Sequence, residues 1–325
     1  MKKLKGGGLY IAISSNGKFM MTTGQNKVYV HSLPDCKNTD TLKTSLSNVT
    51  SAAMSHDCKM VVAKNTSGAI ALLEYPSGRI IGASKMEKKE GYHSICFSVD
   101  DMYILDFDWE GNIMRIEVPS ASASEAVQLK HSVIFKATDE MYTYDDYRSG
   151  VLTHIGYDEA KNELFAIGAG WIYTSPMGEI DFIPKAENGT RWATYFIGKD
   201  HNVLHVERTS LVYDKNWNLV KRFVRNSYSL HAQSAQNDSC LNDDSWYNDK
   251  RNLVRNIAIS DNGDMLAILT SADIAYIYRL DNPEPVRVLI GGVSIPSPRS
   301  ARFINDDTML ALTGWSGTVV VELDL

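Results

Sequence analysis

Hydrophobic and polar residues alternate in one short phrase that recurs along the chain: an apolar strand, a polar turn and a second apolar strand. Residues 11–21 have the sequence IAISSNGKFMM, and residues 257–267 have the closely similar sequence IAISDNGDMLA. Short apolar runs that are bounded by Ser, Asn, Asp and Gly predict strands joined by tight turns. We therefore expect an all-β chain that is built from repeats.

Seven copies of the first strand of this phrase can be aligned. They begin roughly 40 to 45 residues apart in most intervals, and two intervals are longer by about the length of a loop. A repeat of this length predicts a propeller or solenoid, in which each unit buries its faces against its neighbours. The expected first strands are residues 11–14, 52–55, 95–98, 154–158, 194–198, 257–260 and 301–305.

Further strands follow within each unit. Residues 59–64 and 69–75 flank the turn 65–68, whose sequence NTSG supplies the residues that tolerate the positive φ of a tight hairpin. A fourth, more polar strand is expected after a second turn, as at residues 79–84 and 286–290. Four short strands in each of seven units predict a seven-bladed β-propeller of four-stranded blades.

The whole chain, residues 1–325, is expected to form this single propeller domain. The blades are expected at about residues 8–47, 48–90, 91–130, 150–187, 188–226, 252–292 and 293–325. Two insertions, residues 131–149 and 227–251, would interrupt the repeats. Since the last repeat has only three strands, we expect residues 1–7 to supply the missing outer strand and cover the exposed edge.

The same phrases carry a resemblance to a known family. Residues 11–19 and 257–267 resemble the strand, turn and strand of WD40-like propellers, and residues 156–165 are similar to the degenerate repeats of YVTN-type, bacterial propellers. The resemblance spans nearly the whole chain, although the Gly-His and Trp-Asp dipeptides of typical WD40 blades do not occur in it. It implies a scaffold that binds other molecules, usually proteins, on its faces, and a fold of this kind does not fix the function.

Composition narrows the expected partners. The formal charge is −6, with 33 basic and 39 acidic residues and no long Lys/Arg run, so we expect no nucleic acid partner. No apolar run reaches the ~20 residues of a membrane helix, so no membrane insertion is expected. The first residues begin like a signal peptide but continue into the first repeat, and the four cysteines form no CxxC pair. These features favour a reduced, cytoplasmic protein, which we expect to be a monomer or a weak homo-oligomer.

Motifs of catalysis are not found in the sequence. The chain has no phosphate-binding Gly-rich loop, no HExxH zinc motif and no GxSxG nucleophile elbow. We therefore assign no catalytic residue, metal or cofactor, and interpret the protein as a non-catalytic interaction scaffold with a protein partner. Two alternatives stay open: a propeller enzyme of the lactonase or glycan-processing type with an axial metal or acid cluster, and a small-molecule or glycan sensor.

Two groups of residues are candidates for binding. The first lies just before the inner strands or in the hairpin turns between second and third strands, which we expect to share one face. Trp and Arg there suit a partner with carboxylates or a small anion, since these residue types dominate binding hot spots. The members of this face group are His93, Trp109, Trp192, Arg255, Arg299 and Trp315. The alternative is that Trp192 and Trp315 pack between blades while the arginines are solvated.

The second group lies in the two long loops. Long loops on a rigid scaffold often carry function, and exposed aromatic residues among acids suit protein recognition. The members of this loop group are Tyr142, Tyr144, Tyr147, Trp246 and Tyr247. The alternative is that both loops are surface excursions without a function.

Overall fold

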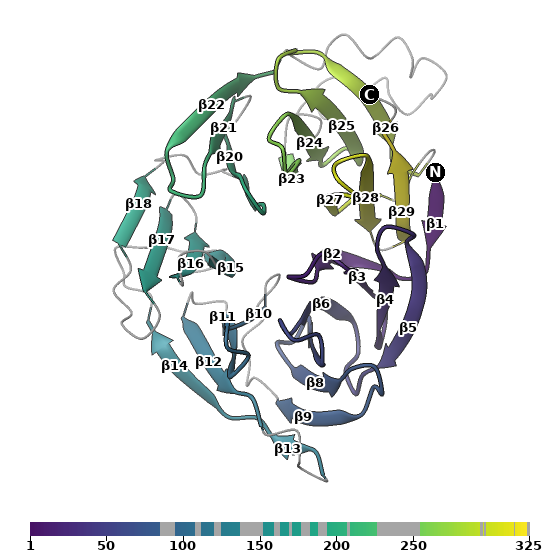
Figure 1. The fold of residues 1–325 in the computed structure, drawn as a ribbon, viewed down its shortest axis with the longest axis vertical. Coiled ribbons are helices and arrows are strands. Elements are labelled where there is room, and N and C mark those ends of the chain that lie inside the picture. The colour runs from purple at the N-terminus through teal and green to yellow at the C-terminus, as the bar shows by residue number, and fades with distance from the viewer. Residues whose placement is uncertain are drawn as a thin grey trace. The chain divides into compact units, whose positions relative to one another are not determined.

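Strands are the regular elements of the described part of this computed structural model (Figure 1). The chain divides into two compact units, one of Leu4–Arg191 and one of Met1–Lys3 with Trp192–Leu325. Among the described residues, no helix is long and apolar enough to cross a membrane. The structure describes residues 1–84, 95–107, 112–119, 125–136, 194–206, 209–225, 254–292, 295, 297–314 and 316–323. It describes the backbone alone of 152–158, 163–168, 171–176 and 183–187, and of the single residues 9, 135, 194, 195, 197 and 206.

The unit Leu4–Arg191 holds four sheets, in which neighbouring strands run antiparallel, apart from one parallel edge strand, and mostly follow the chain order. The first sheet is β2 (Gly7–Ile13), β3 (Phe19–Thr23), β4 (Lys27–Ser32) and β5 (Lys37–Lys43). The second is β6 (Val49–Met54), β7 (Met60–Asn65), β8 (Ile70–Glu74) and β9 (Ile80–Ser84), with β13 (Val127–Gln128) added in parallel at the edge of β9. The third is β10 (Cys96–Phe97), β11 (Tyr103–Phe107), β12 (Ile113–Glu117) and β14 (His131–Phe135). The fourth is β15 (Leu152–Asp158), β16 (Glu163–Gly168), β17 (Trp171–Pro176) and β18 (Ile183–Glu187).

The other unit holds three four-stranded sheets. One is β19 (Thr194–Ile197), β20 (Asn202–Val206), β21 (Thr209–Tyr213) and β22 (Leu219–Val224). The next is β23 (Val254–Ile259), β24 (Met265–Thr270), β25 (Ile274–Arg279) and β26 (Pro285–Ile290). The last is β27 (Ser300–Ile304), β28 (Met309–Gly314), β29 (Gly317–Glu322) and β1 (Lys2–Leu4).

Hydrophobicity decreases from the inner to the outer strands of a sheet. The second strand β24 is buried at five of its six positions, whereas in the outer strand β5 exposed residues alternate with half-buried or buried ones. A strand that is covered on both faces needs a continuous apolar run, and an edge strand that faces water on one side needs alternation. The apolar phrase that repeats in the sequence therefore corresponds to the inner strands of each sheet.

Apolar side chains fill the space between successive sheets within each unit. One cluster joins β3 and β4 to β6–β8, and it includes Val28, Val61 and Leu73. A second cluster joins β7–β9 to β10–β12, and the three sheets of the other unit share a third cluster. Full burial of one Val, Leu or Ile contributes about 1.5–3 kcal/mol. Stacking on a neighbour thus stabilises each sheet, as the repeat pattern predicts.

The N-terminal segment lies at the edge of the last sheet. Strand β1 is the outer strand beside β29, the position that we expected residues 1–7 to fill. The residue after β1 is also held, because the carbonyl oxygen of Lys5 accepts a hydrogen bond from the Thr22 hydroxyl at 3.0 Å. The start of the chain therefore supplies the outer strand of the last sheet.

The structure corrects the predicted start of the first insertion, residues 131–149. Residues 131–135 form β14, which pairs with β12 from Ile113↔Phe135 to Ile116↔His131 and so is the fourth strand of the third sheet. Residues 127–128, which we placed within the third blade, pair instead with β9 of the second sheet. The segment before β14 makes this excursion, so sequence spacing alone placed the fourth strand too early.

Candidate interaction surface

Two of the eleven residues that the sequence predicts for binding lie in the part of the chain that the structure describes. They are Arg255, the second residue of β23, and Arg299, which directly precedes β27. The other members of the face group lie outside the described residues: His93, Trp109, Trp192 and Trp315. The whole loop group also lies outside them: Tyr142, Tyr144, Tyr147, Trp246 and Tyr247.

Arg255 is held by the hairpin turn of its own sheet. Its guanidinium Nη1 donates to Oδ1 of Asp273 at 2.9 Å, and the two side chains are 30% and 36% exposed. Asp273 lies in the turn between β24 and β25 with a φ of 59°, and its N–H donates to the carbonyl of Thr270. The entry of the inner strand and the second hairpin turn therefore meet at one end of the sheet. This is the geometry that the face group assumes.

Arg299 occupies the equivalent position in the next sheet, and β27 lies beside β23. Its backbone N–H donates to the carbonyl of Thr313 at 2.7 Å, which fixes the residue at the start of the strand. Its side chain is half-buried, and its Nε atom is buried without a hydrogen-bond partner among the described residues. A buried donor of this kind costs free energy until a partner or an ordered water satisfies it.

Two further polar atoms lie beside the arginines. The Ser300 hydroxyl and the Asn256 side-chain oxygen are buried without partners among the described residues. Both residues follow an arginine directly, and their register partners, Thr313 and Leu269, lie on the second strands β28 and β24. Two arginines and two unsatisfied polar groups thus occur at the same end of adjacent sheets.

The segment that leads from β26 into Arg299 is closely packed over the hairpin turns. Gly291 donates its N–H to the carbonyl of Asp273 at 2.7 Å, and a Cβ at Gly291 would lie 2.5 Å from that oxygen. A Cβ at Gly314 would lie 1.8 Å from the carbonyl oxygen of Ser297. Glycine is therefore required at both places for the close approach of two backbones. This contact positions the strand entry that carries Arg299.

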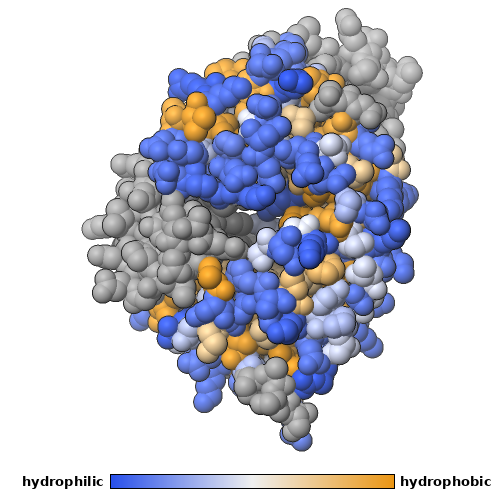
Figure 2. Space-filling model, in the orientation of Figure 1, coloured by the Kyte–Doolittle hydropathy of each residue, from blue (hydrophilic) through white to orange (hydrophobic). Residues whose placement is uncertain are grey.

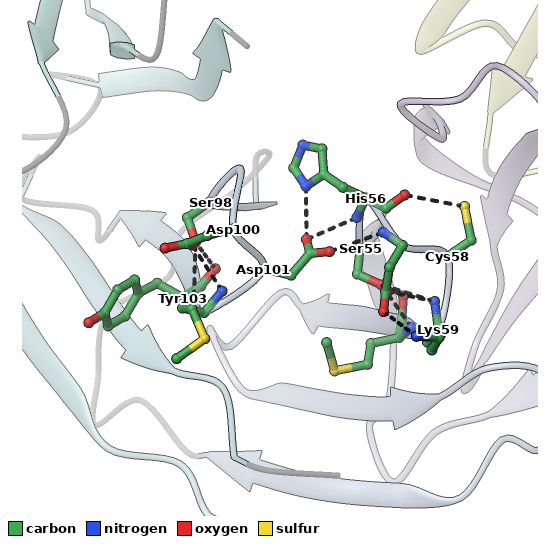
Figure 3. A network of polar contacts seen from close by, with 11 residues as sticks. Ser55, His56, Cys58, Lys59, Ser98, Asp100, Asp101 and Tyr103 are labelled. Carbon is green, nitrogen blue, oxygen red and sulfur yellow. Dashed lines mark hydrogen bonds and ion pairs between the residues drawn. The ribbon is translucent and has the colours of Figure 1, made fainter.

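The opposite ends of the inner strands have a repeated hydrogen-bonded turn. A serine at the end of the first strand donates to an Asn or Asp two residues later and accepts the N–H of the residue five positions on (Figure 3). Four sheets share this turn, with the serines Ser14, Ser55, Ser98 and Ser260. The polar residues of the repeated phrase are therefore explained by local structure.

Aspartates join these turns from one sheet to the next. The Asp101 carboxylate accepts the backbone N–H groups of His56 and Asp57 at 2.9 and 3.0 Å, and it lies 2.8 Å from Nδ1 of His56 (Figure 3). Asp307 repeats the arrangement, since it accepts the N–H groups of Asp261 and Asn262 at 2.8 and 3.0 Å. These carboxylates satisfy donors of the neighbouring turn, so we assign them a structural role.

Two aspartates within these turns, Asp57 and Asp261, have shifted pKa values. Burial opposes ionisation of Asp57, but the hydrogen bonds from Ser55 and from Lys59 outweigh it and lower the Asp57 pKa. Burial, together with the negative charge of Asp307, raises the pKa of Asp261. The described residues contain no group of three or more His, Cys, Asp or Glu side chains that could hold a metal ion.

A buried charged pair lies between the second and third sheets, and sequence reasoning missed it. Lys64 of β7 and Asp106 of β11 form an ion pair, and both side chains are completely buried. The Lys64 ammonium also donates to the carbonyl of Phe107 at 3.2 Å and lies 5.3 Å from the centre of the Phe107 ring. The second oxygen of Asp106 is buried without a partner among the described residues.

Burial shifts the pKa values of Asp106 and of two titratable groups near this pair. Burial raises the pKa of Asp106 even though Lys64 lowers it. Burial raises the pKa of Cys96 to about 12, and burial lowers the pKa of His131, whose Nε2 contacts the Ser84 hydroxyl. An ammonium that is buried in an ion pair is not available to a partner in solution, so we assign the pair to the core.

Comparisons with known proteins agree with the architecture. No protein-family model matches the chain, and no curated protein matches its sequence. Among solved structures, the β-propeller domain of Cps50 (Swd1) from Myceliophteria thermophila is similar over 99% of both chains, with a TM-score of 0.72 and 12% sequence identity. This likeness confirms the predicted fold class: the chain has an all-β propeller fold of the kind that the resemblance to WD40-like repeats implied.

Proposed function

We propose that the protein is a non-catalytic interaction scaffold whose protein partner binds at the end of β23 and β27 that carries Arg255 and Arg299. The propeller fold is compatible with many functions, so the proposal depends on this site rather than on the fold. The observation that carries it is the buried Nε of Arg299, which has no hydrogen-bond partner among the described residues.

Arginine is suited to this role for a physical reason. Its planar guanidinium presents five donors that match a carboxylate with two parallel hydrogen bonds. Arg255 uses Nη1 for Asp273, which orients the guanidinium while the side chain stays 30% exposed. Part of the conformational entropy that binding removes is therefore already lost in the free protein. A partner that presents Asp or Glu side chains is the expected ligand.

The test compares two double variants that remove the same charge. Arg255→Gln/Arg299→Gln removes both guanidinium groups of the proposed site. The control Arg79→Gln/Arg279→Gln removes two arginines that form exposed ion pairs with Glu74 and Asp281. Tagged wild-type and variant proteins are used for affinity capture from lysate of the native cells, and captured proteins are quantified by mass spectrometry.

We expect at least one protein that the wild type and the control capture equally and that the Arg255/Arg299 variant loses by about tenfold or more. A charge-reversing variant of an acidic segment in that protein should weaken binding to the same extent. If the Arg255/Arg299 variant captures every protein that the wild type captures, the proposed site is wrong.

A further inference from the structure

Among the outer strands whose side chains the structure describes, β22 has the most exposed large apolar residues. Leu219, Val220 and Val224 are 56%, 58% and 54% exposed. Figure 2 shows hydrophobic surface, in orange, over the upper left of this face, where β22 lies in Figure 1. Single exposed apolar residues are ordinary, but three of them on one six-residue strand make this strand a candidate binding surface.

The free edge of β22 is the second part of the argument. β22 is the last strand of its sheet, and among the described residues no strand pairs with its outer side. Such an edge presents a row of unpaired N–H and C=O groups that can accept a further strand. The strand itself is packed against the neighbouring sheet. Phe223 is buried, and the centroid of its ring lies 5.2 Å from that of Tyr278.

The same chain shows how an outer strand of this fold accepts one more strand. In the second sheet, β13 pairs in parallel with β9 through Val127↔Gly82 and Gln128↔Ala83. The N–H of Leu129 then donates to the carbonyl of Ala83 at 2.8 Å, and the Leu129 side chain is buried. An apolar extended segment thus covers β9, whereas the equivalent strand β22 has no such cover among the described residues.

Charge selects the kind of segment that would fit. Lys221 and Arg222 form the centre of β22, and no ion pair to either is found among the described residues. In an antiparallel pair of two β22 strands from two copies, these cations would lie opposite each other, and like charges in opposing positions are destabilising. An extended segment with acidic residues places opposite charges there instead. Charge therefore favours a different protein over a second copy of this chain.

We propose that the edge of β22 binds an extended segment of a partner protein, in which Val or Leu alternates with Asp or Glu, by adding it as a fifth strand to the sheet β19–β22. Backbone hydrogen bonds along the edge supply affinity in this mode, and alternate side chains supply specificity. Successive side chains of a strand point to opposite faces, so the apolar residues of the segment lie on the face of Val224 and its carboxylates lie on the face of Lys221. This site does not include Arg255 or Arg299.

The test uses an array of strand-length peptides in which Val or Leu alternates with Glu or Asp, and a matched array with Lys in place of the acids. We expect members of the acidic array to bind the full-length protein with a Kd below about 1 mM, at least tenfold tighter than their Lys counterparts. The charge-reversed variant Lys221→Glu/Arg222→Glu should reverse this preference. The Arg255→Gln/Arg299→Gln variant should bind as the wild type does, which separates this proposal from the proposed function.

Two further measurements decide the mode of binding. A peptide that is N-methylated at alternate residues on the edge-facing side should lose binding, because it cannot donate the backbone hydrogen bonds. Sedimentation of the wild type should show a monomer. If no acidic peptide binds, if both arrays bind equally, or if the wild type is a dimer that Val220→Glu/Val224→Glu converts to a monomer, the proposal is wrong.

Discussion

Replacement of Lys64 by Met should destabilise the protein by about 3–5 kcal/mol, because it removes one partner of a buried ion pair. The side chains of Lys64 and Asp106 are both 0% exposed. Without the ammonium, the first Asp106 oxygen loses its donor, and the second oxygen has no partner among the described residues. Of the influences that lower the pKa of Asp106, the backbone N–H of Phe107 and the charge of His131 then remain.

The effect of Lys64→Met should depend on pH in a defined direction. Burial already raises the pKa of Asp106 above its ordinary value, and loss of the lysine charge raises it further. In the variant, folded Asp106 keeps its proton at pH values at which unfolded Asp106 has lost it. The free energy of unfolding therefore increases as the pH falls from the folded-state pKa of Asp106 to its unfolded-state pKa. The deficit relative to wild type should shrink by at most about 1.4 kcal/mol for each pH unit within that window.

Urea unfolding, followed by tryptophan fluorescence at pH 8 and pH 5, measures both effects. The double variant Lys64→Met/Asp106→Leu removes both charges and should be at least as stable as wild type, since apolar replacement of a buried pair is often neutral or stabilising. It should also show no extra pH dependence. A Lys64→Met deficit below about 1 kcal/mol at pH 8, or one that grows as the pH falls, would refute this account of the pair.

Two further predictions concern contacts between sheets. Asp307→Ala removes the acceptor of two backbone N–H groups and should lower the free energy of unfolding by about 2 kcal/mol. The control Asp264→Asn changes an exposed side chain and should leave the urea midpoint unchanged; equal midpoints for the two variants would contradict the structural role of Asp307. Deletion of residues 2–6 removes β1 and should lower the free energy of unfolding by about 2 kcal/mol. The control Lys3→Thr keeps the strand and should leave the thermal midpoint of the protein unchanged; an unchanged midpoint after the deletion would show that β1 does not stabilise the fold.

Much of the fold could be predicted from the sequence because the repeated phrase is a local pattern. The expected strand 257–260 lies almost wholly in β23, and the expected strand 194–198 corresponds to β19. The fourth strand of the third sheet could not be placed. After β12 the chain first forms β13, which pairs with β9 of the second sheet, and the spacing of the repeats does not indicate such a detour.

The buried pair was missed for a related reason. Lys64 ends an apolar run, and its partner Asp106 is 42 residues away, so no local pattern connects the two. The sequence placed Arg255 and Arg299 at equivalent positions in the repeats, and on that ground we predicted both as binding residues. The sequence could not show that Asp273 orients Arg255. It also could not show that Nε of Arg299 is buried without a partner among the described residues.

The two ends of the sheets β23–β26 and β27–β1 differ in how far their polar groups are satisfied. At the end with the serine turn, Asp307 accepts two N–H groups of the neighbouring turn, and Ser260 bonds within its own turn. At the other end, buried polar atoms of Arg299 and Ser300 have no partners among the described residues. A fully paired network stabilises one conformation, whereas unpaired buried groups cost free energy that a ligand can recover. The partner proposed above would therefore gain more free energy at the arginine end, and substitutions there should separate binding from stability.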